Sequence, residues 1–249
     1  MGMTHVASLR GEEARPFSQA VARELSEHRR CYLLGEQLRE QLAFFDQRSW
    51  REFAGSWNNP CLDGGGQERG KYRLRRAHAW EVDSRGREPR RPVRLRAVEP
   101  LPFVVPGEEA LGEPFEDHVV RNAFFSGLME WALRVFNQVE GENHWRVQAL
   151  QHRTVATPKA VAPALPPGAR REGTTYLLMM LIKRTNVLGG ETLLYDKTGE
   201  ELGRLTMLHP MDCVLTQDEE ILHGLTPILA DRPGENACSD LMVARFTRQ

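Results

Sequence analysis

The sequence predicts an α+β fold in which helices come first and a domain of short strands follows. Two observations carry this prediction. Apolar residues recur at helical spacing through residues 16–57, and short apolar runs separated by turn residues fill the second half. Helices that precede a run of strands are typical of folds in which helices pack on one face of a sheet. We expect one domain over residues 1–249, with a helical and hairpin support region at 1–140 and core strands at 141–249.

The first half has the spacing of amphipathic helices. Within residues 16–57, apolar side chains recur at positions i, i+3 and i+4, and we include Tyr32 and Leu33 in this helical stripe. Residues 122–139 show the same spacing with a denser apolar face. This region predicts a second amphipathic helix, which supplies much of the core.

The second half has the pattern of short strands. We expect strands at WRVQALQHRTVA, TTYLLMMLIKR, ETLLYD, GRLTML, DCVLTQ and DLMVARF. Turn-forming segments such as PPGARREG, NVLGGE and DRPGEN separate them. Several short strands at a spacing of roughly 8–12 residues indicate a sandwich or a barrel.

The composition is that of a soluble globular protein. The chain has 33 Lys and Arg against 34 Asp and Glu, 41% hydrophobic residues and 27% charged residues. No stretch approaches the roughly 20 apolar residues that span a bilayer, and the first residues lack the apolar core of a signal peptide. We therefore expect a cytoplasmic protein with no membrane partner. The four scattered cysteines contain no C-x-x-C pair, which favours buried free thiols.

One segment is strongly basic, although the chain as a whole is close to neutral. Residues 71–96 hold ten basic and three acidic residues, and Arg94 and Arg96 fall on one side of the predicted strand VRLRA. This segment is either the solvated face of a hairpin or a contact for an acidic partner protein. No nucleic-acid motif accompanies it, so we expect no nucleic-acid partner. For the assembly of the chain itself we consider a homodimer.

Five short motifs of the second half occur in a characteristic order. They are Q-x-R at 151–153, PPGARREG at 166–173, N-x-x-GGE at 186–191, D-x-x-x-x-H-x-x-TPI at 218–228 and SDLMVARF at 239–246. In order and spacing the chain resembles the small bacterial iron(II)/2-oxoglutarate dioxygenases of the free L-isoleucine hydroxylase type.

The resemblance implies a double-stranded β-helix, the cupin-like jelly roll, and iron(II) and 2-oxoglutarate as cofactors. In that family two histidines and a carboxylate hold the iron, and an arginine of the last strands receives the distal carboxylate of 2-oxoglutarate. This chain has Arg170 in place of the first histidine, Glu172 in place of the aspartate and Ser239 in place of the arginine. Only the distal histidine, His223, is retained. A guanidinium has no lone pair to offer a metal, which puts iron binding in doubt.

The departures suggest what occupies the metal position instead. Arg170 and Glu172 are two residues apart, so they share one face of an extended segment. We predict that they form an ion pair beside His223 and leave the site free of metal. If iron binds at all, His223 and Glu172 are its ligands. The alternative is that both residues lie at a solvated strand edge and form no site.

Four further residues are predicted to line a substrate or co-substrate pocket: Gln151, Arg153, Tyr176 and Ser239. We expect Arg153 to face the cavity as a replacement anchor, which by strand alternation turns His152 away from it. Arg245 shares the strand parity of Ser239 but lies roughly 20 Å further along, so it is not expected to replace the lost arginine.

Two functions remain open at this point. The first is a divergent enzyme that acts on an amino acid or a related small or carrier-bound substrate. It would use a rewired iron site, or a metal-free reaction with His223 and Glu172 as acid and base and Arg170 beside them. The second is a non-catalytic pseudo-oxygenase that binds a ligand or stabilises a partner.

Overall fold

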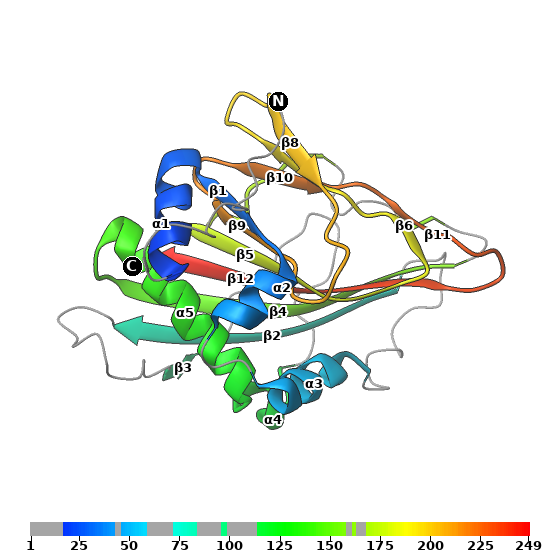
Figure 1. Ribbon diagram of the computed structural model, residues 1–249, viewed down its shortest axis with the longest axis horizontal. Helices are drawn as coiled ribbons and strands as arrows, with labels where there is room; N and C mark the ends of the chain where they lie inside the picture. The colour runs from blue at the N-terminus through cyan, green and yellow to red at the C-terminus, as the bar shows by residue number, and fades with distance from the viewer. Residues whose placement is uncertain are drawn as a thin grey trace.

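The structure is a computed structural model that describes residues 17–42, 46–58, 72–83, 96–98, 114–157, 161–162 and 168–249. Its helices gather on one face of a large sheet, and two smaller sheets lie toward the other face (Figure 1). The helices are α1 (Phe17–His28), α2 (Gly35–Gln41), α3 (Gln47–Gly55), the 3-10 helix η1 (Ser56–Asn58), α4 (Asp117–Val120) and α5 (Ala123–Glu140). The strands are β1 (Arg30–Leu33), β2 (Tyr72–Asp83), β3 (Arg96–Val98), β4 (His144–Ala156), β5 (Tyr176–Thr185), β6 (Val187–Gly189), β7 (Thr192–Tyr195), β8 (Glu201–Leu205), β9 (Cys213–Gln217), β10 (Leu222–Leu225), β11 (Ile228–Ala230) and β12 (Ala237–Arg248).

The large sheet interleaves strands from both halves of the chain. Its order is β1-β9-β5-β12-β4-β2-β3, and each neighbouring pair is antiparallel. The smaller sheets have the orders β10-β7-β8 and β11-β6. The first three strands come from the region expected to be support, so this region also builds the sheet that carries the site.

Helix α5 shows how the sequence builds the apolar core between the helices and the large sheet. The Asn122 side chain accepts a hydrogen bond from the Phe125 backbone nitrogen at 3.1 Å and caps the start of the helix. Gly141, with φ +79°, ends it. Between these caps nine residues of α5 are buried, and they pack against the helix-facing side of the large sheet. The helix predicted over residues 122–139 is confirmed.

The two faces of the large sheet follow strand alternation. On β5, Tyr176, Leu178 and Met180 pack with the helices, whereas Leu177 and Met179 face the smaller sheets. On β12 the same alternation places Met242 and Phe246 with the helices and turns the odd-numbered residues inward. The cavity of the molecule therefore lies between the large sheet and the smaller ones.

One prediction for the first half is wrong. Tyr32 and Leu33 belong to strand β1, which pairs with β9, and not to a helical stripe. Arg29 has φ +61°, a left-handed conformation that ends α1 and redirects the chain into the sheet. Apolar spacing does not reveal this change, because pairing with a strand almost 200 residues away decides it.

Parts of two other expectations lie outside the described residues. Strands β2 and β3 pair antiparallel, as expected for the hairpin, but its turn and the side chains of most of the basic segment 71–96 are outside the described residues. The acidic-partner prediction for this segment stays a prediction. Among the described helices, none combines the length and apolar character that crossing a membrane requires.

Candidate functional site

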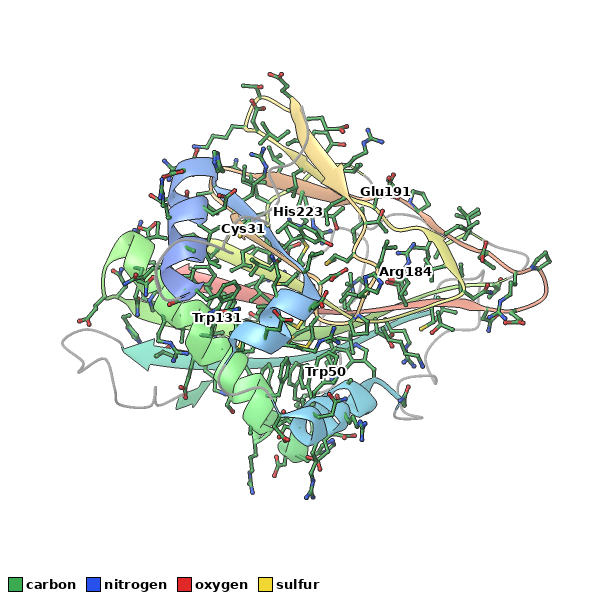
Figure 2. The ribbon with its side chains drawn as sticks, in the orientation of Figure 1. Cys31, Trp50, Trp131, Arg184, Glu191 and His223 are labelled. Atoms are coloured by element: carbon green, nitrogen blue, oxygen red, sulfur yellow. The ribbon has the colours of Figure 1, made fainter. Side chains whose placement is uncertain are left out.

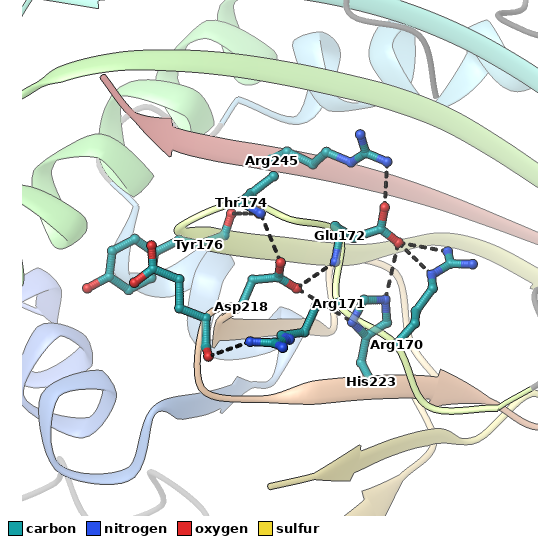
Figure 3. Close-up of polar contacts among 9 residues, drawn as sticks. Arg170, Arg171, Glu172, Thr174, Tyr176, Asp218, His223 and Arg245 are labelled. Carbon is teal, nitrogen blue, oxygen red and sulfur yellow. Dashed lines mark hydrogen bonds and ion pairs between the residues drawn. The ribbon is translucent and has the colours of Figure 1, made fainter. Parts of the chain in front are cut away.

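A short backbone bridge joins the two motifs that carry the predicted site. The Arg170 nitrogen donates to the His223 carbonyl at 2.9 Å, and the His223 nitrogen donates to the Arg170 carbonyl at 2.8 Å. This pairing places the segment that precedes β5 against strand β10, and it brings the side chains of Arg170, Glu172 and His223 together (Figure 3).

Glu172 is the centre of an ion-pair cluster, which we define as Arg170, Glu172, His223 and Arg245. Its Oε1 atom accepts from Arg170 Nε at 2.8 Å and from Arg170 Nη2 at 2.7 Å, and it lies 3.4 Å from His223 Nε2. Its Oε2 atom accepts from Arg245 Nη2. The Glu172 and His223 side chains are only 5% and 6% exposed. Each carboxylate oxygen therefore already faces a guanidinium in a setting with little water.

Asp218 fixes the loop that presents Glu172. Its two oxygens accept from the backbone nitrogens of Glu172 and Thr174, each at 3.0 Å. Asp218 Oδ1 also lies 3.9 Å from His223 Nδ1. Because these hydrogen bonds hold the backbone on both sides of Gly173, the Glu172 side chain is directed into the cluster.

The surroundings of Glu172 keep it ionised. Burial alone raises the pKa of this carboxyl, but hydrogen bonding with His223 and the charges of Arg245 and Arg170 outweigh burial and lower the pKa to about 2. Glu172 is therefore a carboxylate at any neutral pH and holds no proton to donate.

These residues do not fit an iron ion. Arg170 offers no lone pair, and guanidinium groups already engage both oxygens of Glu172. Within the described part of the chain, no three His, Cys, Asp or Glu side chains are grouped so that they could hold a metal. The predicted Arg170–Glu172 pair beside His223 is thus present, and the solvated strand edge is not what the structure shows.

A pocket opens next to the ion-pair cluster. Its walls include His152, Arg184, Leu225 and Ser239. Leu225 and His223 are two residues apart on β10, so they share a face at a spacing of about 7 Å. His223 and Glu172 are not among the residues that line the pocket.

Of the four residues predicted for the pocket, only Ser239 lines it. Gln151 donates to Ser56 Oγ at 2.6 Å, and Arg153 forms a two-pronged ion pair with Asp240 at 2.6 and 2.8 Å. Tyr176 stacks on the helix residue Phe136 with ring centroids 4.3 Å apart. These three residues lie on the helix-facing side of the sheet.

The prediction for β4 is wrong about which alternate residues of the strand face the pocket. We expected Arg153 to face the cavity and His152 to face away, and the structure has the reverse. His152 pairs in register with Leu241, which also lines the pocket, whereas Arg153 pairs in register with Asp240 on the other face. A buried carboxylate across the strand pair, not the pocket, satisfies the Arg153 guanidinium.

Two arginines that the structure places in this region were not predicted from the sequence. Arg245 was not expected to replace the arginine lost at Ser239. It pairs instead with Glu172 in the ion-pair cluster. Arg184 lies outside the five sequence motifs. On β5 a register shift leaves Ile182 without a partner, because Leu181 pairs with Leu241 and Lys183 with Asp240. This bulge reverses the alternation and turns Arg184 inward, which the sequence gives no sign of.

Comparison with known proteins supports the fold and the family. The family model described as 2OG-Fe dioxygenase matches residues 55–245, which is most of the chain. No curated protein sequence matches the chain.

Three solved structures resemble the protein over nearly its whole length. A bsmA homolog from Methylobium petroleophilum PM1 has a TM-score of 0.77 at 22% identity and covers 95% of each chain. IDO from Bacillus thuringiensis has a TM-score of 0.72 at 10% identity and covers 96% of this chain and 98% of its own. The Fe(II)/(alpha)ketoglutarate-dependent dioxygenase TqaL has a TM-score of 0.72 at 17% identity and covers 93% and 86%. The predicted double-stranded β-helix is confirmed, and the chain belongs to the 2OG-Fe dioxygenase family.

Proposed function

We propose that this protein is a divergent member of its family in which the ion-pair cluster replaces the iron site. It binds a small molecule, an amino acid or a related or carrier-bound compound, in the neighbouring pocket. One observation carries the proposal: Arg170 and Arg245 together engage both oxygens of Glu172, the residue that the motif comparison aligns with the family's aspartate. The order of the motifs favours a relationship to the L-isoleucine hydroxylase type.

The geometry favours a non-catalytic, ligand-binding role over a metal-free reaction. Glu172 and His223 are almost fully buried and do not line the pocket, so a bound molecule would not touch them. Glu172 also holds no proton at neutral pH, because its pKa is about 2. An acid–base pair must reach the substrate within hydrogen-bond distance, and this pair is aimed at Arg170 and Arg245 instead.

Iron binding tests the proposal. The full-length protein is dialysed against iron(II) without oxygen, and bound metal is counted for the parent, for His223→Ala and for the double variant Arg170→His/Glu172→Asp. We expect no iron above background in the parent or in His223→Ala. The double variant restores the family's ligand types and should gain iron. Near-stoichiometric iron in the parent that is lost in His223→Ala would overturn the proposal.

A further inference from the structure

Arg184 is an inward-facing cation at the wall of the pocket. The bulge on β5 puts it in register with Ser239, and Ser239 is in turn in register with Thr154 on β4. The three residues therefore form a row across three adjacent strands, and all three line the pocket. Figure 2 shows Arg184 between the large sheet and the strands β6 and β11.

The charge of Arg184 pairs with no acidic side chain in the described part of the chain. Its Nη2 atom donates to the carbonyls of Val187 at 3.2 Å and Gly189, which are neutral acceptors. Among the described residues no carboxylate pairs with it, and Nε and Nη1 make no hydrogen bond to any of them. Burial lowers the pKa of Arg184, yet a guanidinium stays protonated at working pH. A partly buried charge without a counter-ion is costly, and an incoming anion removes that cost.

The rest of the wall narrows the chemistry of that anion. Three polar side chains (His152, Thr154 and Ser239) line the same pocket as Arg184, and the remaining wall is mainly apolar, with Leu181, Leu225 and Leu241. The described residues of the wall include no Asp or Glu to receive an ammonium group and no second Lys or Arg to receive a second carboxylate.

We infer that Arg184 anchors the carboxylate of an organic acid with a single carboxylate and an apolar body, which binds in this pocket without a metal. This inference rests on the proposed function only in taking the pocket as the ligand site. It narrows the ligand class, because a free amino acid brings an ammonium group that this wall does not satisfy. Guanidinium and carboxylate form charge-assisted hydrogen bonds, which are the stronger kind in proteins.

Calorimetric titration of the full-length protein in EDTA tests the inference. The probes are 4-methylpentanoate, its uncharged amide, leucine and 2-oxoglutarate. We expect 4-methylpentanoate to bind at least about tenfold more tightly than each of the other three. The amide loses the charge-assisted contact, whereas leucine brings an ammonium group and 2-oxoglutarate a second carboxylate for which the described wall offers no charged partner. Equal or tighter binding of any of the three, or no binding of 4-methylpentanoate at millimolar concentration, would overturn the inference. This comparison needs no variant.

Variants then assign the contact to Arg184. Arg184→Gln should weaken 4-methylpentanoate binding by about tenfold or more, and Arg184→Lys should weaken it less. Lys183→Gln is the matched control, because it removes one exposed positive charge from the next residue and should leave the affinity unchanged. Undiminished binding by a folded Arg184→Gln variant would contradict the assignment.

The two proposals fail in different ways. If the parent binds iron and also binds the acid in EDTA through Arg184, the ion-pair cluster does not replace the iron site, but the inferred carboxylate site is supported. If the parent binds neither iron nor the acid, only the inference of a carboxylate site is overturned.

Discussion

The ion-pair cluster and the Arg184 pocket use the same side chain in opposite ways. In the cluster, Arg170 and Arg245 each form an ion pair with the one buried carboxylate of Glu172. In the pocket, Arg184 donates to the carbonyls of Val187 and Gly189, and no carboxylate of the described residues pairs with it. Arginines that are ion-paired within the fold stabilise it and have little to offer a ligand. A cation that pairs with no carboxylate in the described part of the chain contributes less to the fold and can bind an anion. The comparison predicts that stability depends on the first region and ligand affinity on the second.

Removal of the central carboxylate should have the largest effect. Glu172→Gln keeps the volume but leaves two guanidinium groups without the charge they converge on, so we expect a loss of about 3 kcal/mol in the free energy of unfolding. Urea denaturation measures it. Glu200→Gln, at an exposed carboxylate, is the control and should change stability by less than about 0.5 kcal/mol. Equal effects of the two variants would show that the cluster is not a stabilising unit.

The second test sets one arginine of each region against the other. Arg245→Leu removes a charged hydrogen bond to Glu172 and should destabilise the protein by about 2 kcal/mol. Arg184→Leu removes a partly buried cation for which the described residues provide no acidic partner, and we expect a change below about 1 kcal/mol. A larger loss for Arg184→Leu than for Arg245→Leu in the same urea titration would reverse the comparison between the two regions.

Acid titration tests the electrostatics of the cluster by itself. The Glu172 pKa in the folded protein, about 2, lies below the value of 4.5 for an unperturbed glutamate. The stabilisation is therefore complete above pH 4.5 and is lost as the pH falls toward 2, by up to about 1.4 kcal/mol per pH unit. The difference in unfolding free energy between the parent and Glu172→Gln should shrink over this range. A constant difference would mean that Glu172 has an ordinary pKa.

The sequence predicts more of the cluster than of the pocket, and the reason is physical. Arg170 and Glu172 are neighbours in the chain, so their pairing follows from local alternation, and a motif identified His223 as their companion. The pocket depends on which face of β4 and β5 turns inward. Apolar residues occupy both faces of these strands, so alternation alone cannot orient them. The pairing of Arg153 with Asp240 and the bulge at Ile182 decide which face of each strand turns inward. Neither can be predicted without knowing the partner strand.

The smallest expected effect concerns the space that Gly190 leaves for Arg184. Gly190 and Gly199 have φ values of +68° and +88°, so alanine at either position costs about 1 kcal/mol in backbone strain. A Cβ atom at residue 199 would meet nothing within 4 Å, whereas at residue 190 it would lie 3.1 Å from Arg184 Nη1 and 2.9 Å from Ile228 Cγ2. Gly190→Ala should therefore weaken 4-methylpentanoate binding a few-fold, while Gly199→Ala leaves it unchanged. Gly190→Ala should also lose more stability, because its Cβ atom meets Ile228 Cγ2. Equal affinities in the two variants would show that the guanidinium tolerates displacement, and the carboxylate contact would then depend on the charge of Arg184 more than on its exact position.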